Sequence, residues 1–235
     1  MNIITTENQL QEVVKAYSAV DAFAFDVETV GENRIQPVVN DVLWISLATE
    51  GRTDVIPMGH PNGEFLRWDK PLLLSGKRKL DAGKEIKEVD YSKKKDSWTP
   101  VFGPAPDQLL PGEVFAALKP LFFSDKLKIG HNVKFDLKSI AKYYRGKVAT
   151  KPFFDTLMAA FIIDNRNKNF LGLADVSKKY LKIEVAKGVG AEVEAHSFSD
   201  VAHYSGFDAE VTWKLYKVLA PQLEGPLKRV WNLEM

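Results

Sequence analysis

Two acids one residue apart stand at the end of an apolar run near the N-terminus. The stretch "FAFDVETVG" at 23–31 contains Asp26 and Glu28, and strand alternation puts both side chains on the same side. Open sheets with parallel strands tend to place ligands at such strand ends. Two carboxylates there repel each other unless a cation lies between them. Because hard divalent cations prefer oxygen ligands, the pair indicates a site for Mg²⁺ or Mn²⁺.

Two further acids occur in contexts that could bring them to the same place. Asp136 ends the stretch "GHNVKFD", four residues after Asn132, and taken alone is typical of an acid that begins a helix. Asp208 ends "HYSGFD" inside a predicted helix, with Tyr204 four residues earlier on the same helical face. Acids within helices are usually solvent-exposed, so neither position indicates a site by itself.

The elements predicted around these acids alternate in a way typical of an α/β fold. Strands are predicted at 22–27, 42–49 and 53–58, and the last two are joined closely enough for a hairpin, so the three form an antiparallel meander. Helices are expected at 7–17, 111–125, 134–144, 156–164, 173–181 and from about 200 to 220, with a short strand at 127–132. This order predicts a mixed sheet, in which parallel strands follow the meander, with helices on both faces.

Two ends of these elements carry capping signals. Thr6 followed by Gln9 reads as a capping box that begins the first helix. Asp155 precedes the helix at 156–164 and is suited to cap it.

Composition sets broad limits on what the protein can be. The chain has 235 residues with 45% hydrophobic and 27% charged residues, which suits one globular domain spanning 1–235. It contains no Cys, which excludes disulfides, thiolate zinc sites and a cysteine nucleophile, and favours a cytoplasmic location. No signal peptide or membrane span is recognised, so we expect a soluble protein without a membrane partner. With a net charge of +1, the protein is not expected to attract or repel charged partners at long range.

Residues at about 69–111 form a charged insertion within this domain. Its run "KRKLDAGKEIKEVDYSKKK" at 77–95 holds eight Lys or Arg against four acids. Such runs are usually solvated surface, and the alternative is a flap that contacts phosphates, to which Tyr91 and Trp98 could add base stacking.

The four acids and the tyrosine together resemble a known family. The motifs "DVET" at 26–29, "HNVKFD" at 131–136 and "YSGFD" at 204–208 are similar to those of the DEDD (DnaQ-like) 3′–5′ exonucleases, tyrosine branch. The greatest similarity is to the proofreading domain of family A (polymerase I-like) DNA polymerases, and it extends over nearly the whole chain outside the insertion. The segment 224–235 resembles the junction at which such polymerases pass into the polymerase domain.

The resemblance implies a ribonuclease H-like fold and a two-metal hydrolysis of DNA from its 3′ end to nucleoside 5′-monophosphates. Asp26, Glu28 and Asp208 would hold one divalent cation with the nucleophilic water, which Tyr204 would orient. Asp26 would bridge to a second Mg²⁺ or Mn²⁺ that is anchored by Asp136.

The resemblance also implies how the substrate is held. Thr29 and Asn132 would contact the last nucleotide of a single-stranded or frayed 3′ end, and a polymerase domain in the same chain or in another would be the partner. Family members also have an aromatic contact before the third motif, and here neither Phe170 nor Phe198 matches it convincingly.

His203 offers a second interpretation of the third motif, because it stands five residues before Asp208 as in the histidine branch. At about 100° per residue, Tyr204 lies about 40° from Asp208 around the helix and His203 about 140°. The geometry favours Tyr204.

Two other functions share these residues. One is an RNA 3′–5′ exonuclease of the ribonuclease D type. The other is a catalytically spent nucleic-acid-binding scaffold of a polymerase, against which the retention of all four acids and the tyrosine counts.

Overall fold

The protein is described by a computed structural model over residues 1–30, 37–61, 105–164, 171–185 and 196–234, together with Val193 and four two-residue strands within 67–101. These strands are β5 (Arg67–Trp68), β6 (Lys79–Leu80), β7 (Ile86–Lys87) and β8 (Pro100–Val101), and they pair antiparallel as β5 with β8 and β6 with β7. The remainder of 69–104, including Tyr91, Trp98 and most of the charge run, lies outside the described residues.

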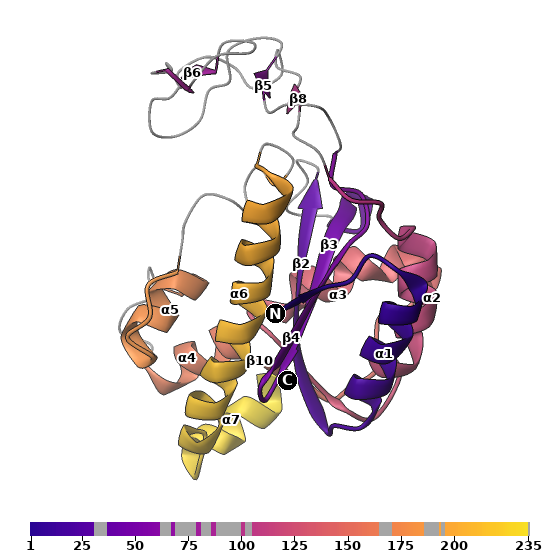
Figure 1. Cartoon of the computed structure of the whole chain (residues 1–235). Coiled ribbons are helices and arrows are strands. Elements are labelled where there is room, and N and C mark those ends of the chain that lie inside the picture. Colours follow the sequence, from indigo (N-terminus) through magenta and orange to yellow (C-terminus); the bar gives the residue numbers. More distant parts are fainter. Residues whose placement is uncertain are drawn as a thin grey trace.

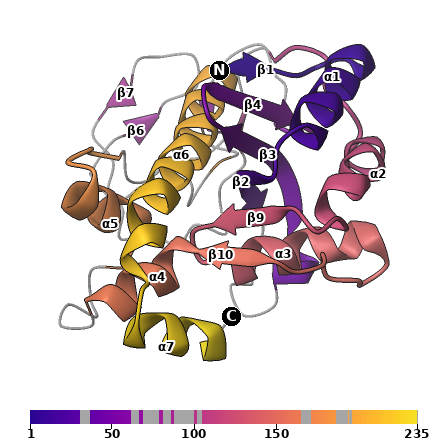
Figure 2. The ribbon, with the colours of Figure 1, turned by 90° about the horizontal axis from the view of Figure 1, so that it is seen from below.

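A six-stranded mixed sheet forms the centre of the molecule, in the order β1-β4-β3-β2-β9-β10 (Figures 1 and 2). The predicted meander is β2 (Ala22–Val30), β3 (Asp41–Thr49) and β4 (Arg52–Pro57), and both pairings are antiparallel. β9 (Leu127–Gly130) pairs parallel with β2, and β10 (Phe153–Asp155) parallel with β9. The predicted mixed sheet is therefore confirmed.

Two strands were not predicted from the sequence. β1 (Asn2–Ile3) pairs parallel with β4, and β10 continues the sheet at its other edge. Segments of two and three residues are too short for hydrophobic alternation to be recognised, and their pairing depends on strands far away in the chain.

Helices cover both faces of the sheet. On one face lie α1 (Glu7–Ser18), α2 (Pro111–Phe122) and α3 (Val133–Ala141), which pack with β2 in a cluster that includes the T-shaped pair Phe25 and Phe122 at 5.0 Å. On the other lie α4 (Thr156–Ile163), α5 (Leu173–Tyr180), α6 (Phe198–Leu219) and α7 (Pro226–Glu234) (Figure 2). Because both faces are covered, β2 and β3 are apolar almost throughout.

The predicted helix caps are confirmed. Thr6 and Gln9 form the capping box of α1, and Asp155 accepts hydrogen bonds at the start of α4. α6 begins at Phe198, two residues earlier than expected, because the Ser197 side chain accepts from the Asp200 N–H at 3.1 Å. None of the described helices has the length and apolar character that crossing a membrane requires.

The long helix α6 crosses close to the sheet, and small residues allow this approach. The hydroxyls of Ser205 and Ser46 form a buried hydrogen bond between α6 and β3. A Cβ added to Gly206 would meet the Sδ atom of Met1 and would lie 2.8 Å from a methyl group of Val55. This contact fixes the height of α6 above the sheet, and α6 carries Tyr204 and Asp208.

We therefore predict that Gly206→Ala destabilises the protein by about 1 kcal/mol, because overpacking outweighs the gain in helix propensity. Gly112→Ala in α2 is the matched control, since an added Cβ there meets nothing within 4 Å. Urea denaturation should show a lower midpoint for the first variant and an equal or higher midpoint for the second. Equal midpoints for both variants would contradict the close approach of α6.

Candidate active site

Carboxylates from three separate elements converge on one place. Asp26 and Glu28 extend from the same face of β2, and Asp208 lies within α6, which packs across that strand. One oxygen from each of the three carboxylates lies within 4.8 Å of the other two. The packing of α6 on the sheet thus brings together the first and third motifs, which lie near opposite ends of the chain.

Asp136 lies beside this group without belonging to its tightest part. It is buried in the first turn of α3, and its Oδ1 accepts a hydrogen bond from the Val27 N–H at 3.4 Å. The parallel pairing of β2 with β9 ends at Ala24, so the N–H of Val27 has no strand partner on that side. Asp136 supplies the missing acceptor and is held against the strand that carries Asp26 and Glu28.

The strand itself is irregular at this point. The register between β2 and β3 shifts between Glu28 and Thr29, which forms a bulge. Bulges redirect side chains and are common next to active sites. Thr29 is half-buried beside the acids.

Tyr204 and His203 take different positions on α6. Tyr204 is half-buried, and its pKa is raised by burial and by the charges of Asp208 and Glu28. His203 is exposed to solvent. The structure therefore places Tyr204 next to the carboxylates and His203 on the outer surface of the helix.

Burial raises the pKa of every acid in the group, and repulsion by a neighbouring acid adds to it for three of the four. For Asp26 the main cause is desolvation, followed by the charge of Asp208. For Glu28 and Asp136 the main cause of the raised pKa is again desolvation, and the charge of Asp26 raises the pKa further. Burial also raises the pKa of Asp208 to about 7, while a hydrogen bond from Tyr204 acts in the opposite direction. The group is costly to keep fully ionised unless positive charge is supplied.

The residues fit a site for hard cations. Oδ1 of Asp208 is buried and has no hydrogen-bond partner among the described residues. In that part of the chain, no Lys or Arg forms a salt bridge with the four acids. A cluster of carboxylate oxygens with an unused buried lone pair has the ligand chemistry that Mg²⁺ and Mn²⁺ require.

Two polar side chains, His131 and Asp155, hold the loop before α3, and we call this pair the clasp. The sequence analysis did not predict this role for either residue. The Asp155 carboxylate accepts from the N–H groups of Asn132 at 3.0 Å and Val133 at 3.1 Å, in addition to Leu157 at 2.9 Å. One acid thus caps two helices. The only sequence signal for Asp155 was its position before α4, which predicts the cap of α4. Its contact with the start of α3 depends on β9 and β10 being neighbours in the sheet.

His131 completes this clasp. Its ring nitrogens lie 2.9 Å from the Thr156 hydroxyl and 2.8 Å from the Leu171 carbonyl oxygen. Between His131 and Asp136, Asn132 adopts a left-handed conformation with φ 62° and leaves its side chain exposed. The clasp holds Asn132 in this conformation beside the first turn of α3.

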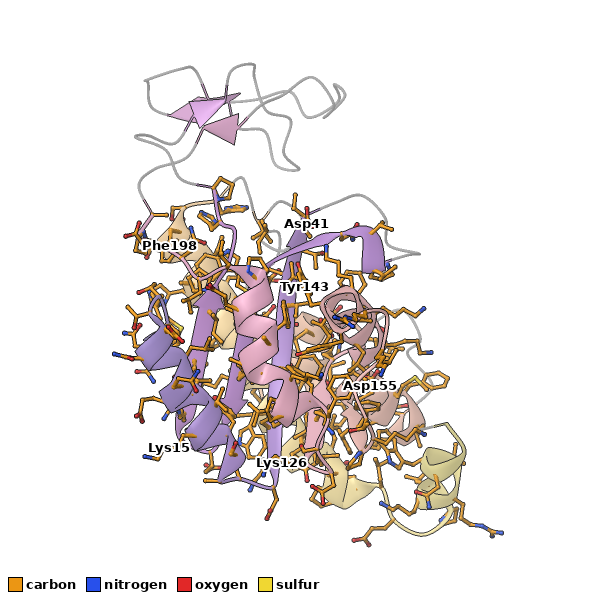
Figure 3. The ribbon with its side chains drawn as sticks, turned by 90° about the vertical axis from the view of Figure 1, so that its right-hand side faces the viewer. Lys15, Asp41, Lys126, Tyr143, Asp155 and Phe198 are labelled. Carbon is orange, nitrogen blue, oxygen red and sulfur yellow. The ribbon has the colours of Figure 1, made fainter. Side chains whose placement is uncertain are left out.

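Of the two aromatic residues before the third motif, the structure describes Phe198, which contacts the cross-strand partner of Glu28. Phe198 packs against Trp44 with ring centroids 4.8 Å apart, and against His60. Figure 3 shows Phe198 near the same end of the molecule as Asp41. Phe170 lies outside the described residues.

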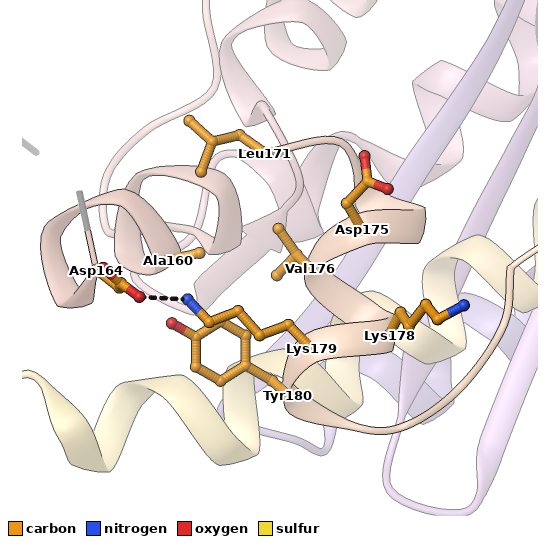
Figure 4. Close-up of a pocket in the computed structure, with 8 residues that line it drawn as sticks. All are labelled: Ala160, Asp164, Leu171, Asp175, Val176, Lys178, Lys179 and Tyr180. Carbon is orange, nitrogen blue, oxygen red and sulfur yellow. Dashed lines mark hydrogen bonds and ion pairs between the residues drawn. The ribbon is translucent and has the colours of Figure 1, made fainter. Parts of the chain in front are cut away.

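Two cavities lie apart from the carboxylates. One of about 370 Å³ lies between α4 and α5, where Lys179 forms an ion pair with Asp164 at 2.8 Å (Figure 4). The other, of about 620 Å³, lies between the β3–β4 turn and the second half of α6. Neither is lined by any of the four acids, so we assign neither to the same site.

Comparison with known proteins identifies the family. Residues 78–224, more than half of the chain, match the 3′–5′ exonuclease family. The chain belongs to that family. The match includes Asp136, Tyr204 and Asp208 but not Asp26 and Glu28, whose place in the site rests on the convergence described above.

Two curated relatives are DNA polymerases. DNA polymerase I of Borreliella burgdorferi is 30% identical over 109 residues, which are 44% of this chain and 12% of that protein. DNA polymerase I of Pseudomonas aeruginosa is 27% identical over 127 residues, which are 51% of this chain and 14% of that protein. The chain therefore spans only a small part of the length of these relatives.

Solved structures show the same fold. The catalytic core of RRP6 from Trypanosoma brucei is similar with a TM-score of 0.63 and 13% identity, covering 98% of this chain and 49% of that chain. RNase D of Escherichia coli, an exoribonuclease involved in structured RNA processing, is similar with a TM-score of 0.57 and 16% identity, covering 94% of this chain and 44% of that chain. The mixed α/β fold is thus that of ribonuclease H-like exonucleases.

The raised pKa values predict how the metal-free protein responds to pH. The folded protein binds protons at these acids more tightly than the unfolded chain does, so its free energy of unfolding should fall as pH rises from 5 to 8. We expect a loss on the order of 2 kcal/mol from Asp208 alone. Urea denaturation in EDTA should show this decline in the wild type and a weaker decline in Asp208→Asn. A stability that rises over this range would contradict the crowding of the acids.

Proposed function

We propose that the chain is a metal-dependent 3′–5′ exodeoxyribonuclease of the proofreading type, which hydrolyses DNA from its 3′ end to nucleoside 5′-monophosphates. The convergence of Asp26, Glu28 and Asp208 within 4.8 Å, with Tyr204 and Asp136 adjacent, is the observation that carries this proposal. The similarity to two DNA polymerases supports DNA as the substrate.

The four acids would hold two divalent cations, Mg²⁺ or Mn²⁺. Asp26, Glu28 and Asp208 would hold one, and Asp26 together with Asp136 would hold the other. When bound, such a pair lowers the pKa of an attacking water and stabilises charge on the attacking and leaving oxygens. The unused Oδ1 of Asp208 supports this assignment.

Tyr204 would orient the attacking water. A tyrosine phenol is neutral near physiological pH, and burial raises the pKa of this one further, so the hydroxyl both donates and accepts hydrogen bonds. It stands beside Asp208, where it can fix the direction of a water molecule in line with the scissile bond. Removal of the hydroxyl should affect turnover more than binding.

Thr29 and Asn132 would contact the terminal nucleotide. Thr29 follows the metal-binding pair on β2, and the clasp of His131 and Asp155 sets the exposed Asn132 beside Asp136. A terminal base must leave its stack to reach a site of this kind, so a single-stranded or frayed 3′ end is the preferred substrate.

The chain would act as one domain spanning 1–235, in which the segment at about 69–111 is an insertion. Since the DNA polymerase relatives are much longer, a polymerase domain is the expected partner, either in the same chain or in a separate one.

An RNA 3′–5′ exonuclease of the ribonuclease D type is the second candidate. The structural similarity to RNase D and RRP6 favours it, since those proteins share the fold over nearly all of this chain. A spent polymerase scaffold is disfavoured because all four acids and Tyr204 are retained.

The decisive experiment offers 5′-labelled single-stranded DNA and RNA of the same sequence to the purified protein with Mg²⁺, Mn²⁺ or EDTA. We expect a ladder of DNA products only with metal, and slower cleavage of RNA. Asp26→Asn should abolish the ladder while leaving metal-free stability equal or higher, because one charge leaves a crowded group. Faster cleavage of RNA would instead select the ribonuclease D type, and no cleavage of either would select the scaffold.

Substitutions on α6 distinguish the two branches of the superfamily. We predict that Tyr204→Phe lowers kcat about 100-fold or more, because the water loses its orienting hydroxyl. The matched change His203→Ala, one residue away on the exposed surface, should alter kcat less than about twofold. The reverse ranking would place the protein in the histidine branch.

A further inference from the structure

Basic residues are concentrated in one short part of a nearly neutral chain. Residues 126–151 contain eight Lys or Arg and a single acid, Asp136, which is buried in the site. The whole chain has 32 Lys and Arg against 31 Asp and Glu, so the remainder has an excess of acids. The charge is therefore unevenly distributed in a way that the total conceals.

Part of this group has a structural role. Lys128 is buried, and its Nζ donates to the carbonyl oxygens of Ser124 and Thr150. Nζ of Lys126 donates to the carbonyl oxygen of Val20 at 2.6 Å. These lysines connect loops at the end of the sheet and are not available to a ligand.

Lys142 is also engaged, and it fixes the end of α3. Its Nζ donates to the carboxylate of Asp41 at 2.6 Å, while the hydroxyl of the next residue, Tyr143, accepts from the Val42 N–H at 3.3 Å. Figure 3 labels Asp41 and Tyr143 close together on this side of the molecule. The helix is thereby fixed to the beginning of β3 and forms a rigid support.

Four more of the eight basic residues are exposed on this support. Lys134 and Lys138 lie one turn apart on the outer face of α3, and Arg145 and Lys147 follow in the turn after it. None of these four forms a salt bridge with an acid in the part of the chain that the structure describes. We call Lys138, Arg145 and Lys147 the basic row.

Helix stability does not explain the whole arrangement. Cations near the C-terminus of a helix interact favourably with its dipole, which accounts for Lys138 and Arg145. Lys134 is in the first turn, where the same dipole disfavours a cation, and Lys147 lies beyond the helix. Positive charge thus continues in both directions past the region where it would stabilise α3.

The basic row shares a helix with the candidate active site. α3 carries Asp136 on its buried side in the first turn and Lys138 on its exposed side, and Arg145 and Lys147 follow beyond the end of the helix. A polyanion whose 3′ end lies at the acids needs positive charge along its next phosphates, because the acids themselves repel it.

We propose that the basic row of Lys138, Arg145 and Lys147 binds the sugar–phosphate backbone of the substrate strand upstream of the nucleotide being removed. The inference rests on the proposed exonuclease function and adds to it a second contact region that short substrates do not reach. The binding is through phosphates and therefore independent of base sequence.

The test compares Lys138→Gln/Arg145→Asn/Lys147→Gln with a matched triple variant of exposed lysines on other helices, Lys15→Gln/Lys119→Gln/Lys228→Gln. Asparagine is chosen at 145 because that residue has φ 57°, which asparagine tolerates. Binding of a fluorescent single-stranded 20-mer is measured by anisotropy in EDTA, where no hydrolysis interferes, between 50 and 300 mM salt. Urea denaturation verifies that both variants remain folded.

We expect the slope of log Kd against log salt to become shallower by about 2 in the first variant, near 0.7 for each lost phosphate contact, and to stay at the wild-type value in the control. With metal present, the rise in KM should be at least about tenfold larger for the 20-mer than for a dinucleotide. Unchanged slopes, or equal changes in both triple variants, would overturn the proposal.

Two further outcomes separate this proposal from its premises. If the wild type cleaves neither substrate but the slopes differ as expected, the exonuclease function fails and the backbone-binding surface remains. If the 20-mer binds equally to wild type and variant while vesicles of phosphatidylcholine with 30% phosphatidylserine lose binding to the variant, the row recognises lipid headgroups and the proposal is wrong.

Discussion

Repulsion among buried carboxylates is the constraint on which the rest of this structure depends. Asp26, Glu28 and Asp208 are held within 4.8 Å although burial already raises the pKa of each. A flexible site would relax by moving these groups into water. Here they cannot separate, because β2 lies in the middle of the sheet and α6 is packed onto it through Ser205 and Gly206. The apolar burial on both faces supplies the free energy that keeps the acids together.

Hydrogen bonds from polar side chains also hold the segments around the site in place. The Asp155 carboxylate accepts hydrogen bonds from N–H groups at the starts of both α3 and α4. The ring of His131, in the loop before α3, lies within hydrogen-bond distance of the Leu171 carbonyl oxygen. Asp136 substitutes for a strand partner at Val27. Each of these groups forms a hydrogen bond with a backbone atom at the start of a helix, in a loop or in β2, so hydrogen bonding helps to set the loop geometry beside the acids.

The distribution of charge complements this arrangement. A site that concentrates negative charge attracts divalent cations and repels a polyanionic substrate, and a chain with almost no net charge cannot offset that repulsion at long range. Four exposed basic residues of 126–151 lie on α3 or in the turn after it, and α3 also carries Asp136.

The sequence by itself determined the local features: the meander at β2, β3 and β4, the capping box at Thr6, the cap at Asp155 and the positions of the four acids. These depend on interactions within a few residues, so hydrophobic period and side-chain chemistry suffice to predict them. The tertiary structure alone decided that β1 and β10 extend the sheet, that Asp155 caps two helices, and that the exposed Lys134 and Lys138 of α3 form no salt bridge with an acid among the described residues. Those outcomes depend on which strands and helices are neighbours, and this is set by contacts between residues tens of positions apart in the chain, such as Asn2 with Asp54 and Asn132 with Asp155.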